Sequence, residues 1–245
     1  MSHTHTEDQL VEQPELEQFF AGVSYRLELA ETTQRRLDQI LATRFNVFKL
    51  IEPDENKLSD ILADLLDPKG SHGQCDLFLR RLFEILGHGA MAKLATDITV
   101  RREAPTNKIE KYRRRIDILV EAGTEALLAI ENKVDSPEQT DQVKDYLEHL
   151  RQSRRRQPMR GVLIYLSRNG EYPRSLPTAK ARELQQEGTL FCWSYADEIR
   201  GWLETCRRDC EAERIRGFLS DFIAYIEASL RRISEHNKET LANEK

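Results

Sequence analysis

The sequence predicts an α/β domain with a mixed sheet of four or five strands, flanked by helices and extended by helical segments at both ends. Three observations carry this prediction. Two apolar runs rich in branched residues, Ile116–Val120 and Ala126–Ile130, are separated by Gly123 and are typical of adjacent strands joined by a tight turn. Two more short apolar segments, 161–167 and 190–194, follow as buried strands. Apolar residues recur at spacings of three and four on both sides of these segments, which is typical of helices.

The N-terminal part is predicted to be helical and without chemistry of its own. Residues 1–13 are polar and are expected to be disordered. Residues 14–51 form a helical extension, as one long helix or two, that packs on the core or on a second copy of the protein. Asp54 can cap the next helix, whose apolar face runs from Leu58 to Leu66. A turn-rich loop and a helix over 76–86 follow.

The remaining elements complete a core that we place at residues 52–195. A strand over 97–104 precedes the two motif strands, and Pro137 can begin the helix after them. The predicted order is therefore helix, three strands, helix, strand. Helices over 196–236 and a polar tail over 237–245 end the chain.

Composition limits the function classes. The chain has 245 residues and a formal net charge of -5, which is unlike a protein that coats nucleic acid non-specifically. It has no apolar run of about 18 residues and no signal peptide at its polar N-terminus, so we expect a cytoplasmic protein without a membrane partner. We expect the four cysteines to be ordinary reduced side chains. They are Cys75, Cys192, Cys206 and Cys210.

Basic residues gather in two groups. The first group flanks the strand that begins near Ile116, so contact with phosphate and a solvated charged loop are both open interpretations. Its members are Arg101, Arg102, Lys108, Lys111, Arg113, Arg114 and Arg115. The second group consists of Arg151, Arg154, Arg155, Arg156 and Arg160.

Charged residues stand at the ends of the two motif strands. Asp117 interrupts the first apolar run, and Glu131 and Lys133 close the second. Residues two apart on a strand face the same way, so Glu131 and Lys133 are expected to lie together. Two carboxylates and a lysine in this arrangement can hold a divalent cation beside a protein cation. Spacing alone favours a different interpretation, in which Glu131 and Lys133 form an exposed ion pair at the strand end and Asp117 pairs with Arg114 or Arg115.

This stretch resembles the core motif of the PD-(D/E)xK nuclease superfamily. Asp117 matches the first acidic position, and Glu131-Asn132-Lys133 matches the E-x-K element. Gln142 and Tyr146 resemble the Q-x-x-x-Y motif of the RecB-like branch. Ile116 stands where the family usually has proline. Residues 55–79 resemble the front end of one mostly uncharacterised bacterial family, with the segments Glu55–Ser59, Leu62–Pro68, His72–Gln74 and Phe78–Leu79.

The resemblance implies a restriction-endonuclease-like fold and a metal-dependent site. Asp117, Glu131 and the backbone carbonyl of Asn132 would bind Mg2+, which Mn2+ can replace. Glu55 would complete the metal site; the alternative is that it is an ordinary glutamate at a helix N-terminus, where the helix dipole favours an acid. Lys133, Gln142 and Tyr146 would act in catalysis. Residues assigned to the second shell or to phosphate contact are Glu103, His72, Arg114 and Arg115, although a loop histidine beside glycine is more often structural.

The resulting hypothesis is a metal-dependent DNA endonuclease that acts in phage defence, restriction or DNA processing. Nothing in the residues separates DNA from RNA, and the choice of DNA follows the resemblance. A catalytically silent protein of the same fold, which binds nucleic acid or scaffolds a defence complex, is the alternative, and an RNA nuclease is another. A homodimer or a partner from a defence system is compatible with each of these hypotheses.

Overall fold

The computed structural model describes residues 13–42, 45–87, 97–106, 114–123, 126–134, 136–156 and 160–230. The chain divides into two compact units, Met1–Phe45 and Asn46–Lys245. The described part of the first unit is formed mainly by α1 (Gln13–Leu41), whose described side chains are almost all exposed. The expected disorder of residues 1–13 and of the tail after residue 236 concerns positions outside the described residues, except for Gln13, the first residue of α1.

The N-terminal helical pattern is divided between the two units. The second helix, α2 (Val47–Ile51), belongs to the second unit, which begins at Asn46. The side chain of Asn46 caps α2 and donates a hydrogen bond to the Asp221 carbonyl at 2.7 Å. Phe48 is fully buried and stacks on Phe222 with ring centroids 4.7 Å apart. These contacts attach α2 to the C-terminal part of the chain.

Five strands form one mixed sheet in sequence order: β1 (Ile98–Pro105), β2 (Arg115–Ala122), β3 (Ala126–Lys133), β4 (Arg160–Ser167) and β5 (Leu190–Ser194). The pairs β1–β2 and β2–β3 are antiparallel, and β3–β4 and β4–β5 are parallel. Gly123 takes a positive φ of 53° in the turn between β2 and β3, where glycine is favoured. The predicted mixed sheet is thus confirmed, with its change from antiparallel to parallel pairing at β3.

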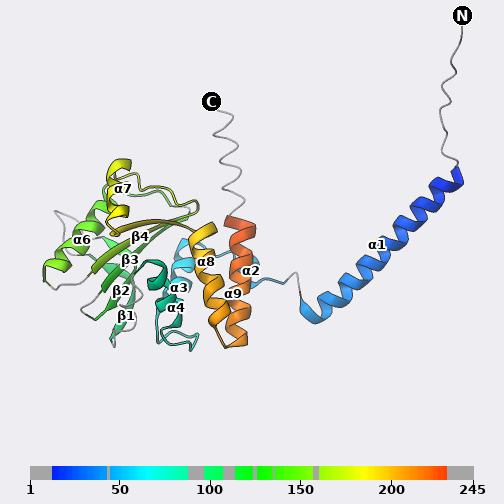
Figure 1. Ribbon diagram of the computed structural model, residues 1–245, viewed down its shortest axis with the longest axis horizontal. Coiled ribbons are helices and arrows are strands. Elements are labelled where there is room, and N and C mark those ends of the chain that lie inside the picture. Colours follow the sequence, from blue (N-terminus) through cyan, green and yellow to red (C-terminus); the bar gives the residue numbers. More distant parts are fainter. Residues whose placement is uncertain are drawn as a thin grey trace, which may run out of the picture. The chain divides into compact units, whose positions relative to one another are not determined.

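Helices cover both faces of the sheet (Figure 1). Alternating side chains of the strands supply the two cores: Ile118 and Val120 point to one face, whereas Leu119 points to the other. Two helices pack on the Leu119 face, α6 (Gln142–Arg156) and α7 (Thr178–Gln186). The opposite face is covered by α3 (Glu55–Leu66), α4 (Leu77–Ile85), η1 (Tyr195–Ile199), α8 (Arg200–Asp209), α9 (Glu213–Tyr225) and η2 (Ile226–Leu230).

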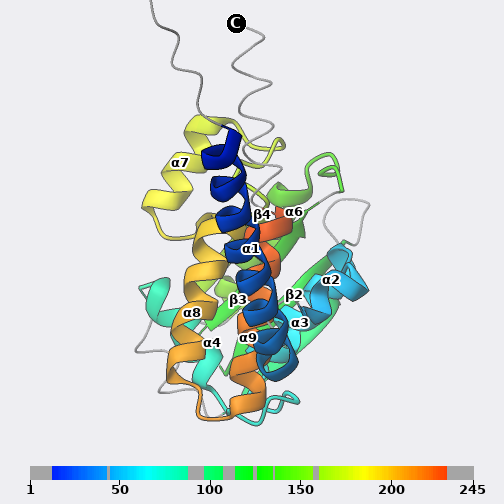
Figure 2. The same cartoon turned by 90° about the vertical axis from the view of Figure 1, so that its right-hand side faces the viewer.

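The C-terminal helices belong to this layer. Figure 2 shows α8 and α9 side by side, and their buried residues share one core with α3 and α4. As expected, Asp54 caps α3, and its carboxylate accepts a hydrogen bond from the Lys57 backbone at 2.7 Å. The four cysteines are free. No helix among the described residues is long and apolar enough to span a bilayer.

The helix after β3 begins at Gln142, so the prediction that Pro137 begins it was wrong. Tertiary contacts hold the intervening residues as a loop. The Glu138 carboxylate accepts hydrogen bonds from the backbone N–H groups of Arg174 and Ser175. Asp141 adopts a positive φ of 58°, which does not suit the interior of a helix. Helix α7 was not predicted from the sequence.

Candidate active site

The candidate site lies where β2 and β3 separate. Their ladder ends at the pair Ile118 and Ile130, although β3 continues to pair with β4 as far as Lys133. One residue beyond the ladder, the Asp117 carboxylate accepts a hydrogen bond from the backbone N–H of Asn132 at 2.8 Å. The Asp117 side chain therefore accepts the hydrogen bond of a β3 backbone N–H, a role that a backbone carbonyl of β2 would have in a continued ladder. This gap between the strands leaves Asp117 and Glu131 at the same end of the sheet.

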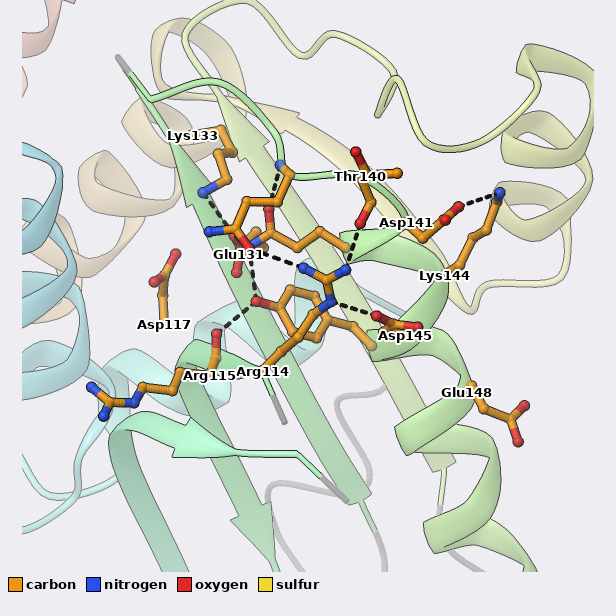
Figure 3. A pocket seen from close by; sticks show the side chains of 13 residues that line it. Arg114, Arg115, Asp117, Glu131, Lys133, Thr140, Asp141, Lys144, Asp145 and Glu148 are labelled. Atoms are coloured by element: carbon orange, nitrogen blue, oxygen red, sulfur yellow. Dashed lines mark hydrogen bonds and ion pairs between the residues drawn. The ribbon is translucent and has the colours of Figure 1, made fainter. Parts of the chain in front are cut away.

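Glu131 and Lys133 meet on the face of the sheet that α6 covers (Figure 3). The Lys133 Nζ lies 2.9 Å from Glu131 Oε1, and Gln142 Nε2 donates to the same oxygen at 2.6 Å. Glu131 is fully buried, and the Lys133 side chain is 11% exposed. The expected same-face arrangement is therefore present, and it is a buried pair rather than an exposed one.

The charge states in this cluster are perturbed. Burial, reinforced by the nearby Asp117 carboxylate, raises the pKa of Glu131 to about 8. Burial also raises the pKa of Asp117, against the opposing effects of the Asn132 N–H and Lys133. For Lys133, burial disfavours the charged ammonium, but the surrounding carboxylates outweigh burial and raise its pKa. The protein alone thus disfavours two ionised carboxylates and keeps the lysine protonated.

Glu55 brings α3 to the same place. It is the first residue of α3, and its Oε2 accepts hydrogen bonds from the backbone N–H groups of Val134 at 2.8 Å and Ser136 at 3.2 Å. Its other oxygen lies 3.9 Å from Lys133 Nζ. Glu55 therefore joins the group formed by Asp117, Glu131 and Lys133.

The Asn132 side chain points to the opposite face of β3. It is fully buried and donates to Ser59 Oγ at 2.9 Å and to the Glu55 carbonyl at 3.1 Å. The Tyr195 hydroxyl donates to its Oδ1 at 3.1 Å. The side chain thus ties β3 to α3 and η1, and it fixes the helix end that carries Glu55. Neither Ser59 nor Tyr195 was predicted from the sequence to contact Asn132.

Gln142 and Tyr146 support Glu131 from α6. They are four residues apart and share one face of the helix. Gln142 Nε2 contacts Glu131 and also the Tyr146 hydroxyl at 3.0 Å, and the Gln142 Oε1 accepts from Gln139 N–H at 3.1 Å. The Tyr146 hydroxyl donates to the Arg115 carbonyl at 2.6 Å. Burial raises the pKa of Tyr146, so the phenol stays neutral.

These side chains line a cavity of about 1070 Å³. Arg114 forms part of its wall: the guanidinium binds the Asp145 carboxylate, the Thr140 carbonyl and Gln139 Oε1. Arg114 thus fixes the loop before α6 through its hydrogen bonds. The lining residues are Arg114, Arg115, Asp117, Glu131, Lys133, Gln139, Thr140, Asp141, Gln142, Lys144, Asp145, Tyr146 and Glu148.

Three other predicted residues lie at the margin or outside the cavity. Arg115 extends away from Glu131 in Figure 3 and pairs with Glu103 at 2.9 Å, with both side chains at least half exposed. Glu103 does not line the cavity. His72 is buried in its loop, where Nε2 contacts the Asp67 carbonyl and Nδ1 accepts from Gln74 N–H, each at 2.9 Å. Both ring nitrogens of His72 are therefore used locally.

Arg102, which the sequence placed only in a basic group, positions the strand segment around Asp117. Its guanidinium binds the Asp117 carbonyl, Asp60 Oδ1 at 2.9 Å and the Asn56 carbonyl at 3.3 Å. The hydrogen bond from Arg102 lowers the pKa of Asp60. Arg102 therefore joins α3 to the strand that carries Asp117.

The other basic residues have local partners or lie outside the described part. Arg101 pairs with Glu121 at 2.7 Å, and Arg151 binds the Glu148 carboxylate. Lys108, Lys111 and Arg113 are outside the described residues, as are the side chains of Arg154, Arg155, Arg156 and Arg160.

The donor set suits a hard cation. Glu131 Oε2 is buried and has no hydrogen-bond partner in the structure, and such an atom is costly to leave without one. A cation would satisfy this oxygen and would offset the charge of the two carboxylates. Within the described ranges, no group of three or more His, Cys, Asp or Glu side chains is arranged to hold a metal alone. Mg2+ retains several waters, so fewer protein ligands suffice.

A mixed sheet with an acid on one strand, and a second acid and a lysine on the neighbouring strand at the same end of the sheet, is the arrangement of a nuclease-type α/β domain. A family model described as the PD-(D/E)XK nuclease superfamily matches residues 45–224, which is most of the chain. The chain belongs to this superfamily. No curated protein matches it, and no solved structure does.

Proposed function

We propose that this protein is a metal-dependent endonuclease that hydrolyses phosphodiester bonds in DNA. The observation that supports this most is the buried contact of 2.9 Å between Lys133 and Glu131, beside Asp117 on the wall of a large polar cavity. An ion pair of structural value alone has no need of a neighbouring carboxylate or of an unpartnered buried oxygen.

Asp117, the free oxygen of Glu131 and the Asn132 carbonyl are the proposed ligands of Mg2+ or Mn2+, with Glu55 direct or through water. A bound divalent cation supplies Lewis acidity and a more acidic water at the phosphate. Carboxylate and carbonyl oxygens are the ligand types that Mg2+ prefers. In this role the Asp117 and Glu131 carboxylates ionise together, because the cation offsets the repulsion that raises the Glu131 pKa.

Lys133 is proposed to orient the attacking water and to stabilise the charge that develops on the phosphate. Its raised pKa keeps the ammonium protonated, which favours an electrostatic role over that of a general base. Gln142 and Tyr146 are proposed as positioning residues, because Gln142 holds Glu131 and Tyr146 holds Gln142. Arg115 is the lining arginine with the most exposed side chain, which suits contact with a phosphate.

The choice of DNA, and a role in phage defence, restriction or DNA processing, follow the resemblance to the bacterial family, and the proposed location in the cytoplasm follows the sequence pattern. The intact set of Asp117, Glu131 and Lys133 opposes the alternative of a silent binding component. An RNA substrate uses the same phosphodiester chemistry and is therefore the second arm of the test.

The test is cleavage of supercoiled plasmid by the full-length protein with Mg2+ or Mn2+. We expect nicking or linearisation that EDTA and Lys133→Ala both abolish. Lys180→Ala is the matched control, because this exposed lysine pairs with Glu183 on α7 and lies outside the cavity. Absence of cleavage under all conditions would contradict the DNA endonuclease proposal, and single-stranded RNA would then be tested with the same proteins.

A further inference from the structure

We propose that α1 forms a parallel two-stranded coiled coil with α1 of a second copy of this chain. Figure 1 shows α1 as one uninterrupted helix, and its 29 residues correspond to a length of about 40 Å. The proposal depends on the spacing, the exposure and the flanking charges of its apolar residues.

The spacing is that of a heptad repeat. Eight residues follow one another at alternating intervals of four and three, and seven of them are apolar. This period of 3.5 residues keeps one seam facing a partner helix, which then supercoils with it. The seam consists of Leu16, Phe20, Val23, Leu27, Ala30, Gln34, Leu37 and Leu41.

The described residues of the first unit leave the seam uncovered. Its large apolar side chains are exposed by between 37% at Val23 and 63% at Leu41. Helices in water gain most of their stability from packing an apolar face, and a continuous exposed stripe of this kind indicates an interaction surface. A partner helix of the same length would cover the whole seam.

The flanking charges favour a second copy in parallel orientation. Intervals of four and then three from Leu16 place Leu27 and Gln34 at a positions, Arg26 at a g position and Glu31 at an e position. In a parallel pair, each g residue lies beside the e residue five positions further along the partner, so Arg26 meets Glu31 twice. In an antiparallel pair, e positions would face e positions and g positions would face g positions, which brings like charges together. Gln34, the single polar seam residue, would lie beside Gln34 of the second copy in the parallel register.

Under the proposed function, such a dimer would bring two cleavage sites to one duplex. That consequence rests on the proposed function, whereas the dimer itself does not. Its test measures mass and therefore distinguishes failure of the coiled coil from failure of the nuclease proposal.

The first experiment is light scattering of the full-length protein during size-exclusion chromatography. We expect twice the chain mass of 28.5 kDa for the wild type and a monomer for Leu27→Asp. Leu29→Asp is the matched control: Leu29 is 56% exposed and Leu27 60%, but Leu29 lies away from the seam. A wild-type monomer at every concentration, as when α1 packs on its own chain, would overturn the proposal, and so would equal effects of the two substitutions.

The second experiment tests the orientation by charge exchange. Arg26→Glu and Glu31→Arg should each raise the dimer dissociation constant by roughly tenfold, because like charges then face each other twice. Mixing the two variants should give heterodimers in preference to either homodimer. A mixture that shows no preference would overturn the parallel arrangement.

Discussion

Asn132→Ala should destabilise the protein even though the substituted side chain points away from the cavity. The Asn132 amide is fully buried and makes three hydrogen bonds, to Ser59, the Glu55 carbonyl and Tyr195. Each contributes about 1 kcal/mol net, and the buried partners left behind lose their own hydrogen bonds. We therefore expect the free energy of unfolding to fall by about 3 kcal/mol.

Denaturation in guanidinium chloride, followed by circular dichroism, measures this loss. Asn56→Ala is the control, since the Asn56 side chain is exposed on α3 and should change stability by no more than about 0.5 kcal/mol. A loss for Asn132→Ala as small as that of the control would refute the view that this amide ties α3 to β3. Because the amide also holds the Glu55 carbonyl, cleavage should weaken together with stability.

Three further predictions address other contacts. Gln142→Leu removes the donor to Glu131, so metal affinity and cleavage should fall by about 10- to 100-fold with the fold retained, as calorimetric Mn2+ titration would show; unchanged affinity would contradict the positioning role. In EDTA, the protein should lose stability as pH rises from about 4.5 toward about 8, because the pKa of Glu131 is raised in the folded state and its ionisation then opposes folding. Glu131→Gln should flatten this dependence in melting temperatures measured at both pH values, and a slope that persists would implicate another group. Phe48→Ala should cost about 3–5 kcal/mol in urea denaturation, because the ring is fully buried against Phe222, and a loss below about 1 kcal/mol would argue against α2 as part of the second unit.

The sheet and the centre of the site follow from local patterns. The strands have branched apolar runs, and the period of two places Glu131 and Lys133 on one face without knowledge of the fold. The same period puts Asn132 on the opposite face. Its partners could not be inferred, because Ser59 and Tyr195 are 73 and 63 residues away in the sequence.

The wrong helix start at Pro137 has the same origin. Proline is favoured at the start of a helix, but contacts of Glu138 with residues about 36 positions later keep the segment after Pro137 as a loop. Phe48 continues the helical spacing of the N-terminal region, yet its aromatic partners lie near the other end of the chain, so α2 packs with the second unit. Sequence periodicity reports which face of an element is apolar and not which distant element covers it.

The central claim is that Asp117 binds the metal ion and that Lys133 acts on the phosphate. Calorimetric titration of Mn2+ and plasmid cleavage should be measured on the same preparations of the wild type, Asp117→Ala and Lys133→Ala. We predict that Asp117→Ala loses both metal binding and cleavage, and that Lys133→Ala loses cleavage while it still binds Mn2+. Cleavage retained by Lys133→Ala, or unchanged Mn2+ binding by Asp117→Ala, would contradict the assignment.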